Sequence, residues 1–472
     1  MKNVRIAMTA VVLFAALPVF AAIEIVSPGP GAVVPILTDA QKAYLSLPAA
    51  ERRAKFADNS FRRREMGLPS ERVPGEKTAR EAYWPKTVRL AWKGAEGVDY
   101  RVVVTPAKNG GAVIEEKVRG SELYIDNLEM ATEYKWVVDG GGDRGEGSFR
   151  TEDVAPRLVR YPGVPNVRDL GGRIGLWGRR VRQGMVFRSA GLNDNASDVY
   201  YTREELRELG KMAELKAAAE EAQKRLDQLL AWQADPKTMD LKDREYVEWK
   251  NRHIGEPIAK FLSSRIHRAK ESVKNGGDPK VVKGKKPGRN RVEGEKGAYI
   301  LKRFGIKTDI DLRTDGECFG MTGSPLGPVV NWVHVSSSAY GGMTEDVGKR
   351  AFAKVFRVFL DEKNYPIDFH CIAGQDRTGA VAYILNGLLG VDEDQLALDW
   401  ETTGFWNRNN GIRHKGRYDK LVECFVKHYP APTVRERLEK YVLSIGFAEA
   451  DIEKFRSIML EQDRAVATKS GD

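Results

Sequence analysis

Cysteine is scarce in this sequence: Cys318, Cys371 and Cys424 are the three present among 472 residues. Scaffolds that replace a hydrophobic core with disulfides need a far higher cysteine content, so that class of protein is excluded. Hydrophobic residues make up 42% of the chain, which is enough to bury real cores, and the length suits two or three domains. We therefore expect a multidomain protein that is stabilised by packing.

Long apolar runs are missing apart from Ala7 to Phe20, which is too short for a comfortable membrane span. Lys2 and Arg5 precede this run, and Val19-Phe20-Ala21 ends it as an acceptable cleavage site. These features predict a signal peptide over residues 1–21, export to the periplasm or secretion, and no transmembrane segment after cleavage. An uncleaved anchor is the alternative.

Motifs for nucleic-acid recognition are also missing, although the formal net charge is +10. We expect no nucleic-acid partner, and the positive charge suits a phosphorylated or otherwise anionic substrate. Part of the excess charge is concentrated between residues 280 and 291, where proline and glycine predict a flexible basic loop. Its basic residues are Lys280, Lys283, Lys285, Lys286, Arg289 and Arg291. Such a loop would steer anionic substrates or contact acidic lipid headgroups; the alternative is a solvated loop without function.

The stretch that stands out is Asp368 to Gly379, with the sequence DFHCIAGQDRTG. The apolar segment Pro366 to Phe369 is predicted as a buried strand, and the apolar residues after the stretch recur at helical spacing until Gly390. A strand, a tight loop and a helix N-terminus direct backbone N–H groups and the positive end of the helix dipole to one point. The sequence therefore predicts an anion-binding loop.

Cys371 lies in this loop, six residues before Arg377. A thiolate is a far better nucleophile than a thiol, and such a loop should lower the pKa of Cys371 strongly. Arg377 offers a planar fork that can hold two phosphoryl oxygens, Thr378 can donate its hydroxyl to the thiolate, and His370 is expected to orient the loop. A cysteine placed in this way can form a phosphocysteine intermediate that water hydrolyses. The alternative is a buried structural cysteine that happens to precede an arginine.

The string His370 to Gly379, of the form H-C-x-x-G-x-x-R-T-G, resembles the signature of cysteine-dependent protein tyrosine phosphatases. The resemblance implies that Cys371 is the nucleophile, that Arg377 clamps the phosphate, and that the reaction uses no metal or cofactor. The residues that would bind the substrate phosphate are Ile372, Ala373, Gly374, Gln375, Asp376 and Arg377.

Three further stretches are similar to a bacterial phosphatase family related to tyrosine and phosphoinositide phosphatases. They are NVRDLGG at 166–172, FRSAG at 187–191 and GIKTDIDLR at 305–313. The residues that this similarity places around the loop in a supporting role, together with His370 and Thr378, are Arg168, Asp169, Arg188, Asp311, Arg313 and Glu317. A structural charge network without substrate contact is the alternative.

A general acid is needed to protonate the leaving oxygen. Many phosphatases of this class place an aspartate on the loop that corresponds to residues 334–340, but no carboxylate is present there. Related bacterial enzymes carry an aspartate at the position of Asp376, so we predict Asp376 as the acid. The alternative is that Asp376 only fixes the loop; Asp311 and Asp346 are lesser candidates for the acid.

The first half of the chain has a different pattern. Between residues 88 and 152, six runs with period two are separated by turn signals, which predicts a β-sandwich. Trp92 and the Leu128…Tyr134 pair resemble the core tryptophan and tyrosine corner of fibronectin type III domains. We predict an all-β domain of this kind over residues 22–155, with helical residues 38–80 inserted in it.

The second half alternates strand and helix patterns, which predicts an α/β domain with a mostly parallel sheet over residues 156–465. A helical insertion that carries the basic loop is predicted for residues 202–292. Taken together, the fold class is an N-terminal fibronectin III-like sandwich followed by an α/β tyrosine-phosphatase domain with a helical insertion.

The function expected from the resemblance is a protein tyrosine phosphatase, with phosphotyrosine protein as its partner. One alternative is a phosphatase of phosphoinositides or inositol polyphosphates with the same mechanism. Lipid-active relatives often carry lysine where this sequence has Gln375, which weakens that alternative. The other is a non-catalytic phosphate-binding adaptor, against which stand the intact Cys371, Arg377 and Thr378.

Overall fold

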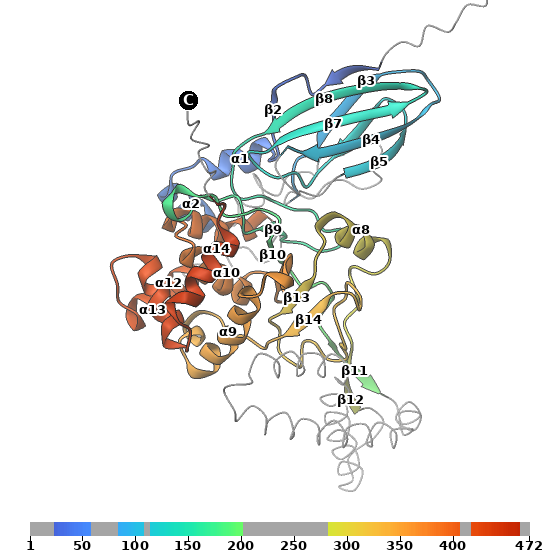
Figure 1. The fold of residues 1–472 in the computed structure, drawn as a ribbon. Helices are drawn as coiled ribbons and strands as arrows, with labels where there is room; N and C mark the ends of the chain where they lie inside the picture. Colours follow the sequence, from blue (N-terminus) through green and yellow to red (C-terminus); the bar gives the residue numbers. More distant parts are fainter. Residues whose placement is uncertain (1–22, 58–83, 108–113, 202–281, 406–416, 463–472) are drawn as a thin grey trace, which may run out of the picture. The chain divides into compact units, whose positions relative to one another are not determined.

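The computed structural model describes residues 23–57, 84–107, 114–201, 282–405 and 417–462 (Figure 1). By its contacts the chain divides into two compact units. The smaller, here called the β unit, comprises Met1–Val33, Arg89–Tyr124 and Glu133–Arg150. The larger, here called the α/β unit, comprises Val34–Val88, Ile125–Thr132 and Thr151–Asp472. The predicted signal peptide and most of the predicted helical insertion lie outside the described residues, and the domain boundaries predicted from the sequence stay predictions.

The β unit is built on two sheets, and every run predicted as a strand between residues 88 and 152 forms one. One sheet has the order β1-β3-β6 and the other the order β2-β8-β7-β4-β5. The strands are β1 (Glu24–Ser27), β2 (Ala32–Val34), β3 (Val88–Lys93), β4 (Asp99–Pro106), β5 (Ile114–Arg119), β6 (Glu122–Ile125), β7 (Glu133–Gly140) and β8 (Asp143–Thr151).

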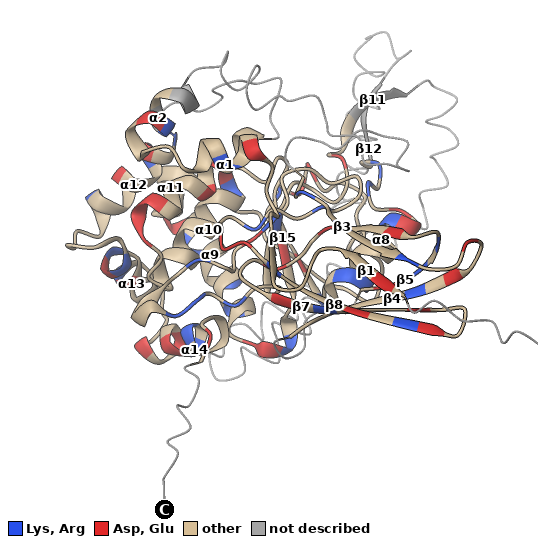
Figure 2. Ribbon diagram, turned by 90° about the horizontal axis from the view of Figure 1, so that it is seen from above, with Lys and Arg blue, Asp and Glu red and all other residues tan. Residues whose placement is uncertain are grey.

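Buried aromatic rings join these two sheets. Trp92 of β3 lies 5.5 Å from the ring centroid of Tyr100 on β4 and 6.4 Å from that of Trp136 on β7. All three side chains are buried. Along each strand alternate residues face the same side, so every second residue can contribute to this core. Neighbouring residues in these strands, such as Lys93, Arg101 and Lys135, are charged and exposed. Basic and acidic residues alternate with other residues along the strands of this unit (Figure 2). Exposed pairs such as Arg101 with Glu115 stabilise the unit little.

The α/β unit is organised around a sheet with the order β14-β13-β15-β10-β9. Four of its strands are parallel, as predicted, and β9 is an antiparallel edge strand. Every residue of β10, β13 and β15 is buried, which is typical of parallel strands covered on both faces. The strands are β9 (Arg168–Asp169), β10 (Val186–Ser189), β13 (Thr308–Asp311), β14 (Asn331–His334) and β15 (Ile367–His370).

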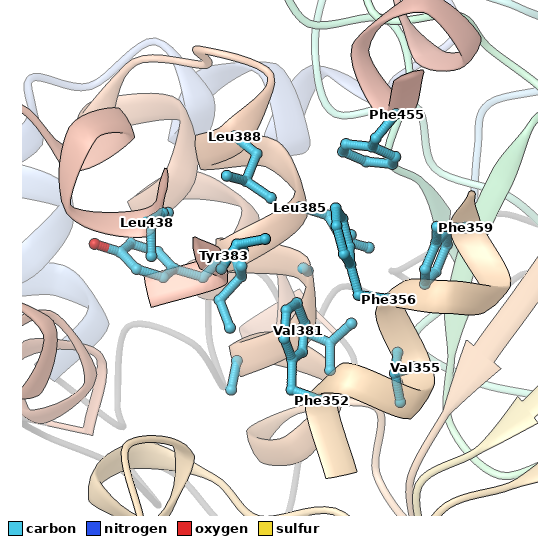
Figure 3. Packing of buried hydrophobic residues seen from close by; sticks show 14 of the residues in the cluster. Phe352, Val355, Phe356, Phe359, Val381, Tyr383, Leu385, Leu388, Leu438 and Phe455 are labelled. Carbon is cyan, nitrogen blue, oxygen red and sulfur yellow. The ribbon is translucent and has the colours of Figure 1, made fainter. Parts of the chain in front are cut away.

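Helices cover both faces of this sheet. One face packs against a cluster to which α9 contributes Phe352, Phe356 and Phe359, and α10 contributes Val381 and Leu385 (Figure 3). Burying each of these side chains contributes about 1.5–3 kcal/mol to folding. The helices of this cluster are α9 (Asp346–Phe359), α10 (Asp376–Leu388), α11 (Glu393–Glu401), α12 (Arg417–His428), α13 (Val434–Ser444) and α14 (Glu449–Met459).

On the other face, helix α8 (Glu295–Phe304) packs through Phe304. The ring of Phe304 lies 4.9 Å from that of Tyr161 and 5.2 Å from that of Phe187, measured between centroids. Helix α8 ends at Gly305, which has a φ of +61° and so adopts the left-handed conformation that favours glycine. Short 3-10 helices complete the unit: η2 (Leu176–Gly178), η5 (Tyr340–Met343), η6 (Glu362–Asn364) and η7 (Thr402–Phe405).

Two N-terminal helices also belong to the α/β unit, although the sequence placed them inside the sandwich. They are α1 (Asp39–Leu45), which begins with the capping box of Thr38 and Gln41, and α2 (Ala49–Ala57). Glu401, at the end of α11, accepts hydrogen bonds of 3.1 Å from Tyr44 and from Arg52. Since Tyr44 and Arg52 are buried, these helices are packed parts of this unit.

The basic segment predicted as a flexible loop is in part a strand. Strand β12 (Val282–Lys286) pairs with β11 (Ser197–Tyr201) in an antiparallel ladder. The loop prediction was therefore wrong for these residues, because a backbone ladder with a segment some 80 residues earlier overrides the local charge pattern. Farther along, Arg291 Nε bonds Asp194 Oδ1 at 2.7 Å.

The register of the sheet gathers three loops at one edge. Ser189 at the end of β10 and Asp311 at the end of β13 both lie beside His370, the last residue of β15. The carboxyl ends of parallel strands are where open α/β sheets form their ligand crevices. The loop after β15 contains Cys371.

Candidate active site

Residues 371–377, here called the Cys371 loop, connect β15 to α10. Gly374 has a φ of +63°, and a Cβ at this position would collide with the backbone carbonyl of Ser189 on β10. A residue with a side chain would thus be strained and would also push the loop away from the sheet. Gly374 is what allows the loop to turn tightly against β10.

The backbone carbonyl groups of residues 372–375 all accept hydrogen bonds from donors that are not part of the Cys371 loop. The backbone N–H of Gly191, in the loop after β10, donates to Ile372 O at 3.1 Å. At the other end, the N–H of Gly379 donates to Gln375 O at 2.7 Å, within the first turn of α10. These bonds draw the carbonyl groups outward.

Two side chains hold the middle of the loop. Asn166 Nδ2 donates to Ala373 O at 2.8 Å, and Arg188 Nη2 donates to Gly374 O at 2.7 Å. Since the carbonyls point outward, the N–H groups of the loop face its interior. A ring of N–H groups at a helix N-terminus binds an oxyanion.

Cys371 lies inside this ring and is 3% exposed. Burial of its thiol acts to raise the pKa, but the charge of Arg377, the Thr378 hydroxyl and the N–H groups of Thr378 and Gln375 outweigh it, so the pKa of Cys371 is lowered. Among the described residues the Thr378 hydroxyl has no other hydrogen-bond partner, which leaves it for the sulfur. The sulfur is thus prepared as a thiolate.

Arg377 is aligned by Glu317, from the loop after β13. Its Nη1 and Nη2 donate to the two carboxylate oxygens at 2.7 and 3.2 Å, and Nη1 also donates to Leu312 O at 3.3 Å. Burial acts to raise the pKa of Glu317, but the bonds from Arg377 and Thr314 lower it overall. Nε–H and one Nη2–H have no acceptor among the described residues and remain for a bound oxyanion.

Beneath the loop, one carboxylate is shared by three arginines. Asp399 of α11 accepts from Arg168 Nε and from Arg173 Nη2, each at 3.0 Å, and also from Arg188 Nη1. Burial acts to raise the pKa of Asp399, but the three guanidinium groups hold it well below its usual range. Burial lowers the pKa of Arg168 to about 9. Three positive charges around one negative charge favour an anion in the loop above.

The sequence analysis predicted that Arg168 and Arg188 support the loop. Arg188 bonds Gly374 O directly, whereas Arg168 bonds Asn166 and Asp399, which lie next to the loop or to Arg188. The sequence analysis did not predict Asn166 or Arg173 as site residues, and it did not predict the ion pairs of Asp399 with arginines. Asp399 is a lone acidic residue within the apolar run LALDW, which is the one local signal for a buried partner. Nothing in the sequence near residue 399 identifies that partner as a set of arginines more than 200 residues earlier.

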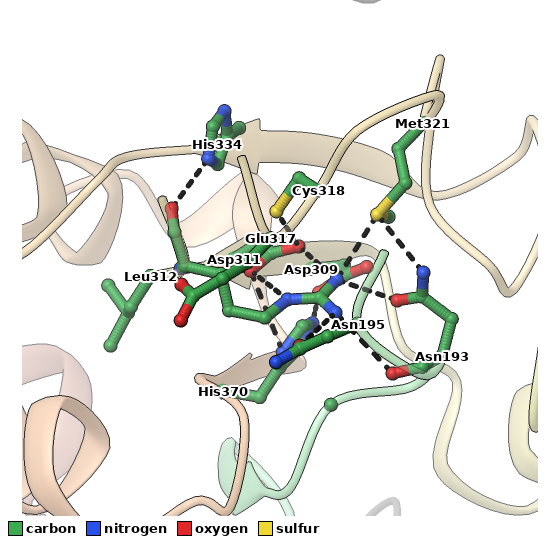
Figure 4. Close-up of polar contacts among 12 residues, drawn as sticks. Asn193, Asn195, Asp309, Asp311, Leu312, Glu317, Cys318, Met321, His334 and His370 are labelled. Carbon is green, nitrogen blue, oxygen red and sulfur yellow. Dashed lines mark hydrogen bonds and ion pairs between the residues drawn. The ribbon is translucent and has the colours of Figure 1, made fainter. Parts of the chain in front are cut away.

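His370 is held between two aspartates (Figure 4). Its Nε2 lies 3.0 Å from Asp309 Oδ1, its Nδ1 lies 3.8 Å from Asp311 Oδ1, and Nδ1 contacts Cys371 O at 3.3 Å. Burial acts to lower the pKa of His370, but Asp311 and Asp309 raise it to about 9. The ring is therefore charged at neutral pH and fixes the start of the loop, in line with the orienting role expected for it.

Asp311 and Arg313 form a buried pair, with Arg313 Nη2 donating to Asp311 Oδ2 at 2.6 Å (Figure 4). Burial acts to raise the pKa of Asp311, but His370 and Arg313 hold it well below its usual range. Cys318 Sγ lies 3.2 Å from the same carboxylate, and burial raises the pKa of that thiol. Because all of these partners are buried, Asp311 supports His370 and has no place for the leaving oxygen of a substrate.

Asp169 is not at the Cys371 loop, unlike the expectation from the sequence. It bonds Arg157 Nη1 at 2.7 Å and accepts from the N–H groups of Gly171 and Gly184 at 2.8 and 2.6 Å. It fixes the turn that follows β9. Because the side chains of neighbouring strand residues face opposite sides, Arg168 and Asp169 cannot both point at the loop.

Asp376 is the first residue of α10, beside Arg377. Its Oδ1 accepts a hydrogen bond from the phenol of Tyr340, and its Oδ2 accepts from Arg417 Nη1 at 3.0 Å. Sequence reasoning missed both partners. Tyr340 lies on the connection after β14 in which no acid was found, so this connection supplies a partner for the aspartate instead. Asp346, the other lesser candidate for the acid, lies exposed at the start of α9.

The arrangement combines a thiolate, a ring of N–H donors, an aligned guanidinium and a nearby carboxyl group. Such a site can bind an oxyanion, attack its central atom and protonate a departing oxygen. Among the described residues, no group of three or more His, Cys, Asp or Glu side chains is placed to hold a metal ion.

Comparison with known proteins finds one family. The model of the tyrosine phosphatase family matches residues 159–276 and 290–461, which together make up more than half of the chain. No curated protein matches. The matched residues include the Cys371 loop and every strand of the central sheet.

Proposed function

The chain belongs to the tyrosine phosphatase family, which implies a phosphorylated substrate, and we propose that it hydrolyses phosphomonoesters through a phosphocysteine intermediate on Cys371. Phosphotyrosine protein is the substrate that we propose first. The observation that carries the proposal is the Cys371 thiol, whose pKa is lowered within a ring of N–H donors although it is buried.

In the first step the Cys371 thiolate attacks phosphorus and the P–O bond to the leaving group breaks. The loop N–H groups and Arg377 hold the three phosphoryl oxygens, where charge rearranges during the transfer. The carboxyl group of Asp376 gives its proton to the departing oxygen. The products of this step are a phosphocysteine, a free phenol or alcohol, and the Asp376 carboxylate.

In the second step water attacks phosphorus and the P–S bond breaks. The Asp376 carboxylate takes a proton from this water, and inorganic phosphate leaves. The Cys371 thiolate is regenerated because its surroundings stabilise the anion. Protons and charge balance over the two steps without a further reactant.

The test is the substitution Cys371→Ser, assayed on a phosphotyrosine peptide with a chelator present. We expect turnover to fall to background while binding of inorganic phosphate or vanadate persists, because the N–H ring and Arg377 remain. Cys424→Ser is the matched control, since Cys424 is half-buried and lies on α12. Hydrolysis by purified Cys371→Ser protein at more than a few per cent of the wild-type rate would refute the mechanism.

A second candidate is a phosphatase of phosphoinositides or inositol polyphosphates. The excess of buried guanidinium groups around Asp399 and the half-exposed Arg417 beside Asp376 favour it. Gln375, where lipid-active relatives often have lysine, weighs against it. A third, a non-catalytic adaptor, would show phosphate binding in the wild type without turnover.

We propose that the β unit is a fibronectin type III-like module and that the protein is exported to the periplasm or secreted. The packing of Trp92 between two sheets supports the first proposal, and the apolar run that follows Lys2 and Arg5 supports the second. Of the helices that the structure describes, none combines the length and apolar character needed to cross a bilayer. N-terminal sequencing of the mature protein from cell fractions tests the export proposal.

A further inference from the structure

Three side chains from separate elements meet at the edge of the Cys371 loop. Tyr340 of η5 donates its phenol proton to Asp376 Oδ1, and Arg417 of α12 donates from Nη1 to Asp376 Oδ2 at 3.0 Å. The same Nη1 donates to the Tyr340 oxygen at 3.1 Å, and the guanidinium carbon lies 5.5 Å from the centre of the Tyr340 ring. Both oxygens of Asp376 are therefore occupied.

Arg417 uses little of its capacity to donate hydrogen bonds. Its contacts with described residues all run through Nη1, so Nε and Nη2 have no acceptor in that part of the chain. The Arg417 side chain is 37% exposed and that of Asp376 is 30% exposed. Arg417 bonds Asp376, the residue before the phosphate clamp Arg377, so an arginine with donors that bond no other described residue lies beside the Cys371 loop. Such a guanidinium can bind a second anionic group of the substrate.

The occupied state of Asp376 conflicts with its proposed role as the acid. Burial acts first to raise the pKa of Tyr340, and its bond to Asp376 raises it further, so the phenol is neutral. Burial acts to lower the pKa of Arg417, but Tyr340 and Asp376 raise it overall, so the guanidinium is positive. In the free enzyme the two oxygens of Asp376 are therefore bonded to Tyr340 and Arg417, and neither oxygen is left to contact the leaving oxygen of a substrate.

The conformation of Tyr340 is consistent with a functional constraint. Its φ is +53°, a region that residues with a side chain rarely adopt. The ring is held by Trp400, with centroids 6.1 Å apart. Strained backbone of this kind persists where the surrounding structure imposes it, and it is common at functional sites.

We propose that Arg417 is a specificity-determining residue that binds a second anionic group of the substrate and thereby releases Asp376 to act as the acid. Tyr340 is then a positioning residue that keeps the released carboxyl group near the leaving oxygen. This inference rests on the proposed function. Among the described residues, the charged group that bonds Asp376 is Arg417 from α12, and Arg377 follows Asp376 in the chain.

The sequence of events is balanced. A phosphate or carboxylate on the substrate binds Nε and Nη2 of Arg417 and turns the guanidinium, so that Nη1 leaves Asp376 Oδ2. Asp376 Oδ2 then takes a proton from a hydronium ion, which leaves as water. The thiolate attacks phosphorus, the P–O bond breaks, and the proton on Asp376 passes to the leaving oxygen. In the hydrolysis of the phosphocysteine Asp376 takes a proton from the attacking water. This proton returns to solvent when the product leaves, and Arg417 bonds the carboxylate again. The substrate class is thus a phosphomonoester that carries a second negative group close to the scissile phosphate.

The experiment compares wild type with Arg417→Gln on two matched pairs of substrates. One pair is a phosphotyrosine peptide with glutamate on both sides and the same peptide with glutamine. The other is an inositol bisphosphate with adjacent phosphates and an inositol monophosphate. Arg435→Gln is the matched control, because Arg435 is 36% exposed and also forms an ion pair, with Glu439 on α13.

We expect wild type to favour the doubly anionic member of at least one pair by about tenfold in kcat, as one charge-assisted contact allows. The pair that shows this preference identifies whether the second anion comes from a peptide or from a phosphorylated ring. In Arg417→Gln the preference should fall to about twofold, while Arg435→Gln keeps it. On the singly anionic members, the alkaline limb of the kcat profile should differ between Arg417→Gln and wild type, because Arg417 bonds Asp376 Oδ2 in the free enzyme. Tyr340→Phe should alter the same limb and leave the preference for the second anion intact.

Wild type without a preference in either pair would overturn the inference, and so would an Arg417→Gln variant that loses all four activities equally. Failure of the proposed function itself has a different result. In that case wild type would not turn over any of the four substrates, or Cys371→Ser would turn them over as well.

Discussion

Three carboxylates around the Cys371 loop have different roles because their partners differ. Glu317 accepts both ends of the Arg377 fork and so sets the plane of the guanidinium. Asp399 is buried among three arginines and cannot reach a substrate. Asp376 is bonded by Tyr340 and by the half-exposed Arg417 and not by the phosphate clamp, so of the three it is the one that we propose as the acid. Side-chain type alone does not separate these roles.

The role of Asp376 can be tested by the leaving group. For Asp376→Asn we expect kcat to fall about 10²–10³-fold on phosphotyrosine, whose phenol has a pKa of ~10, and far less on a nitrophenyl ester, whose oxygen leaves without a proton. The alkaline limb of the kcat profile should flatten as well. Steady-state kinetics over a range of pH provides the measurement.

An equal loss on both substrates would mean that Asp376 only fixes the loop through Tyr340 and Arg417. No loss on either substrate would require another acid. Asp346→Asn is the matched control, because Asp346 also opens a helix but is exposed at the start of α9.

Helix α11 contacts β9 and β10 through Asp399, which forms ion pairs with Arg168 and Arg188. Arg188 of β10 bonds both Asp399 and Gly374 O, so the position of the loop depends on a helix that follows it by two elements. On the opposite side, Tyr44 of α1 and Arg52 of α2 hold the end of α11 through Glu401. The geometry of the loop is therefore supported by elements from both ends of the α/β unit.

Asp399→Asn should be both destabilising and inactivating. Removing one partner of a buried ion cluster typically costs about 3–5 kcal/mol, because the remaining charges stay buried without compensation. Arg188 would also lose the contact that aims it at Gly374 O, so kcat should fall even where the protein remains folded. Calorimetry and kinetics at a temperature below the unfolding transition measure the two effects separately.

Glu393→Gln is the control for this substitution. Glu393 lies on the same helix and pairs with Arg437 Nη2 at 3.3 Å, but it is 70% exposed, so its loss should change stability by less than about 1 kcal/mol. A folded Asp399→Asn protein with wild-type kcat would show that the arginine cluster does not position the loop.

Stability of the whole molecule should depend on pH through the buried groups of β15. The pKa of His370 is raised to about 9 from an unfolded value of ~6.5, so its contribution is complete below about pH 6.5 and is lost as the pH rises to about 9. The pKa of Asp368 is raised to about 7, first by burial, and this acts in the same direction between pH ~3.9 and 7. Both groups bind more protons in the folded protein.

We therefore expect His370 to lower the free energy of unfolding by on the order of 3 kcal/mol between pH 6.5 and 9. The unfolding temperature should fall as a result of this contribution. In His370→Asn this slope should become much flatter, although the variant is less stable overall. His428→Asn is the control, because His428 is exposed in the last turn of α12. The lowered pKa of the Cys371 thiol acts in the opposite direction over this range, so the deciding comparison is between wild type and His370→Asn. Equal slopes for the two proteins would contradict the charged state of His370. The measurement is calorimetry at constant ionic strength.

The net charge of +10 predicts that anionic substrates are attracted over distance. Replacing Lys280, Lys283, Lys285 and Lys286 with glutamine should lower kcat/KM about threefold at low salt and leave kcat nearly unchanged, and the difference should vanish in high salt. Stopped-flow or steady-state kinetics over a series of salt concentrations tests this. Equal kinetics at low ionic strength would mean that this basic segment has no role in association.

The secondary structure around Cys371 could be predicted from the sequence. The strand before Cys371, the tight turn at Gly374 and the helix after Asp376 follow from residues within about 25 positions, and β15 and α10 confirm them. The same holds for the strands of the β unit and for helix α13 with its capping box at Thr433. Local propensity and hydrophobic period act over short distances along the chain, so a sequence displays them directly.

The surroundings of the Cys371 loop could not be predicted from the sequence, because they depend on how the elements pack. The partners of Asp376 come from Tyr340 and Arg417, and Asp399 meets three arginines that precede it by more than 200 residues. The same long-range pairing makes β12 a strand. Such contacts depend on strand register and on how helices cross the sheet, and neither is encoded near the residues concerned. A charged residue in a sequence shows that it needs a partner, whereas packing decides which partner it obtains and whether water can still reach it.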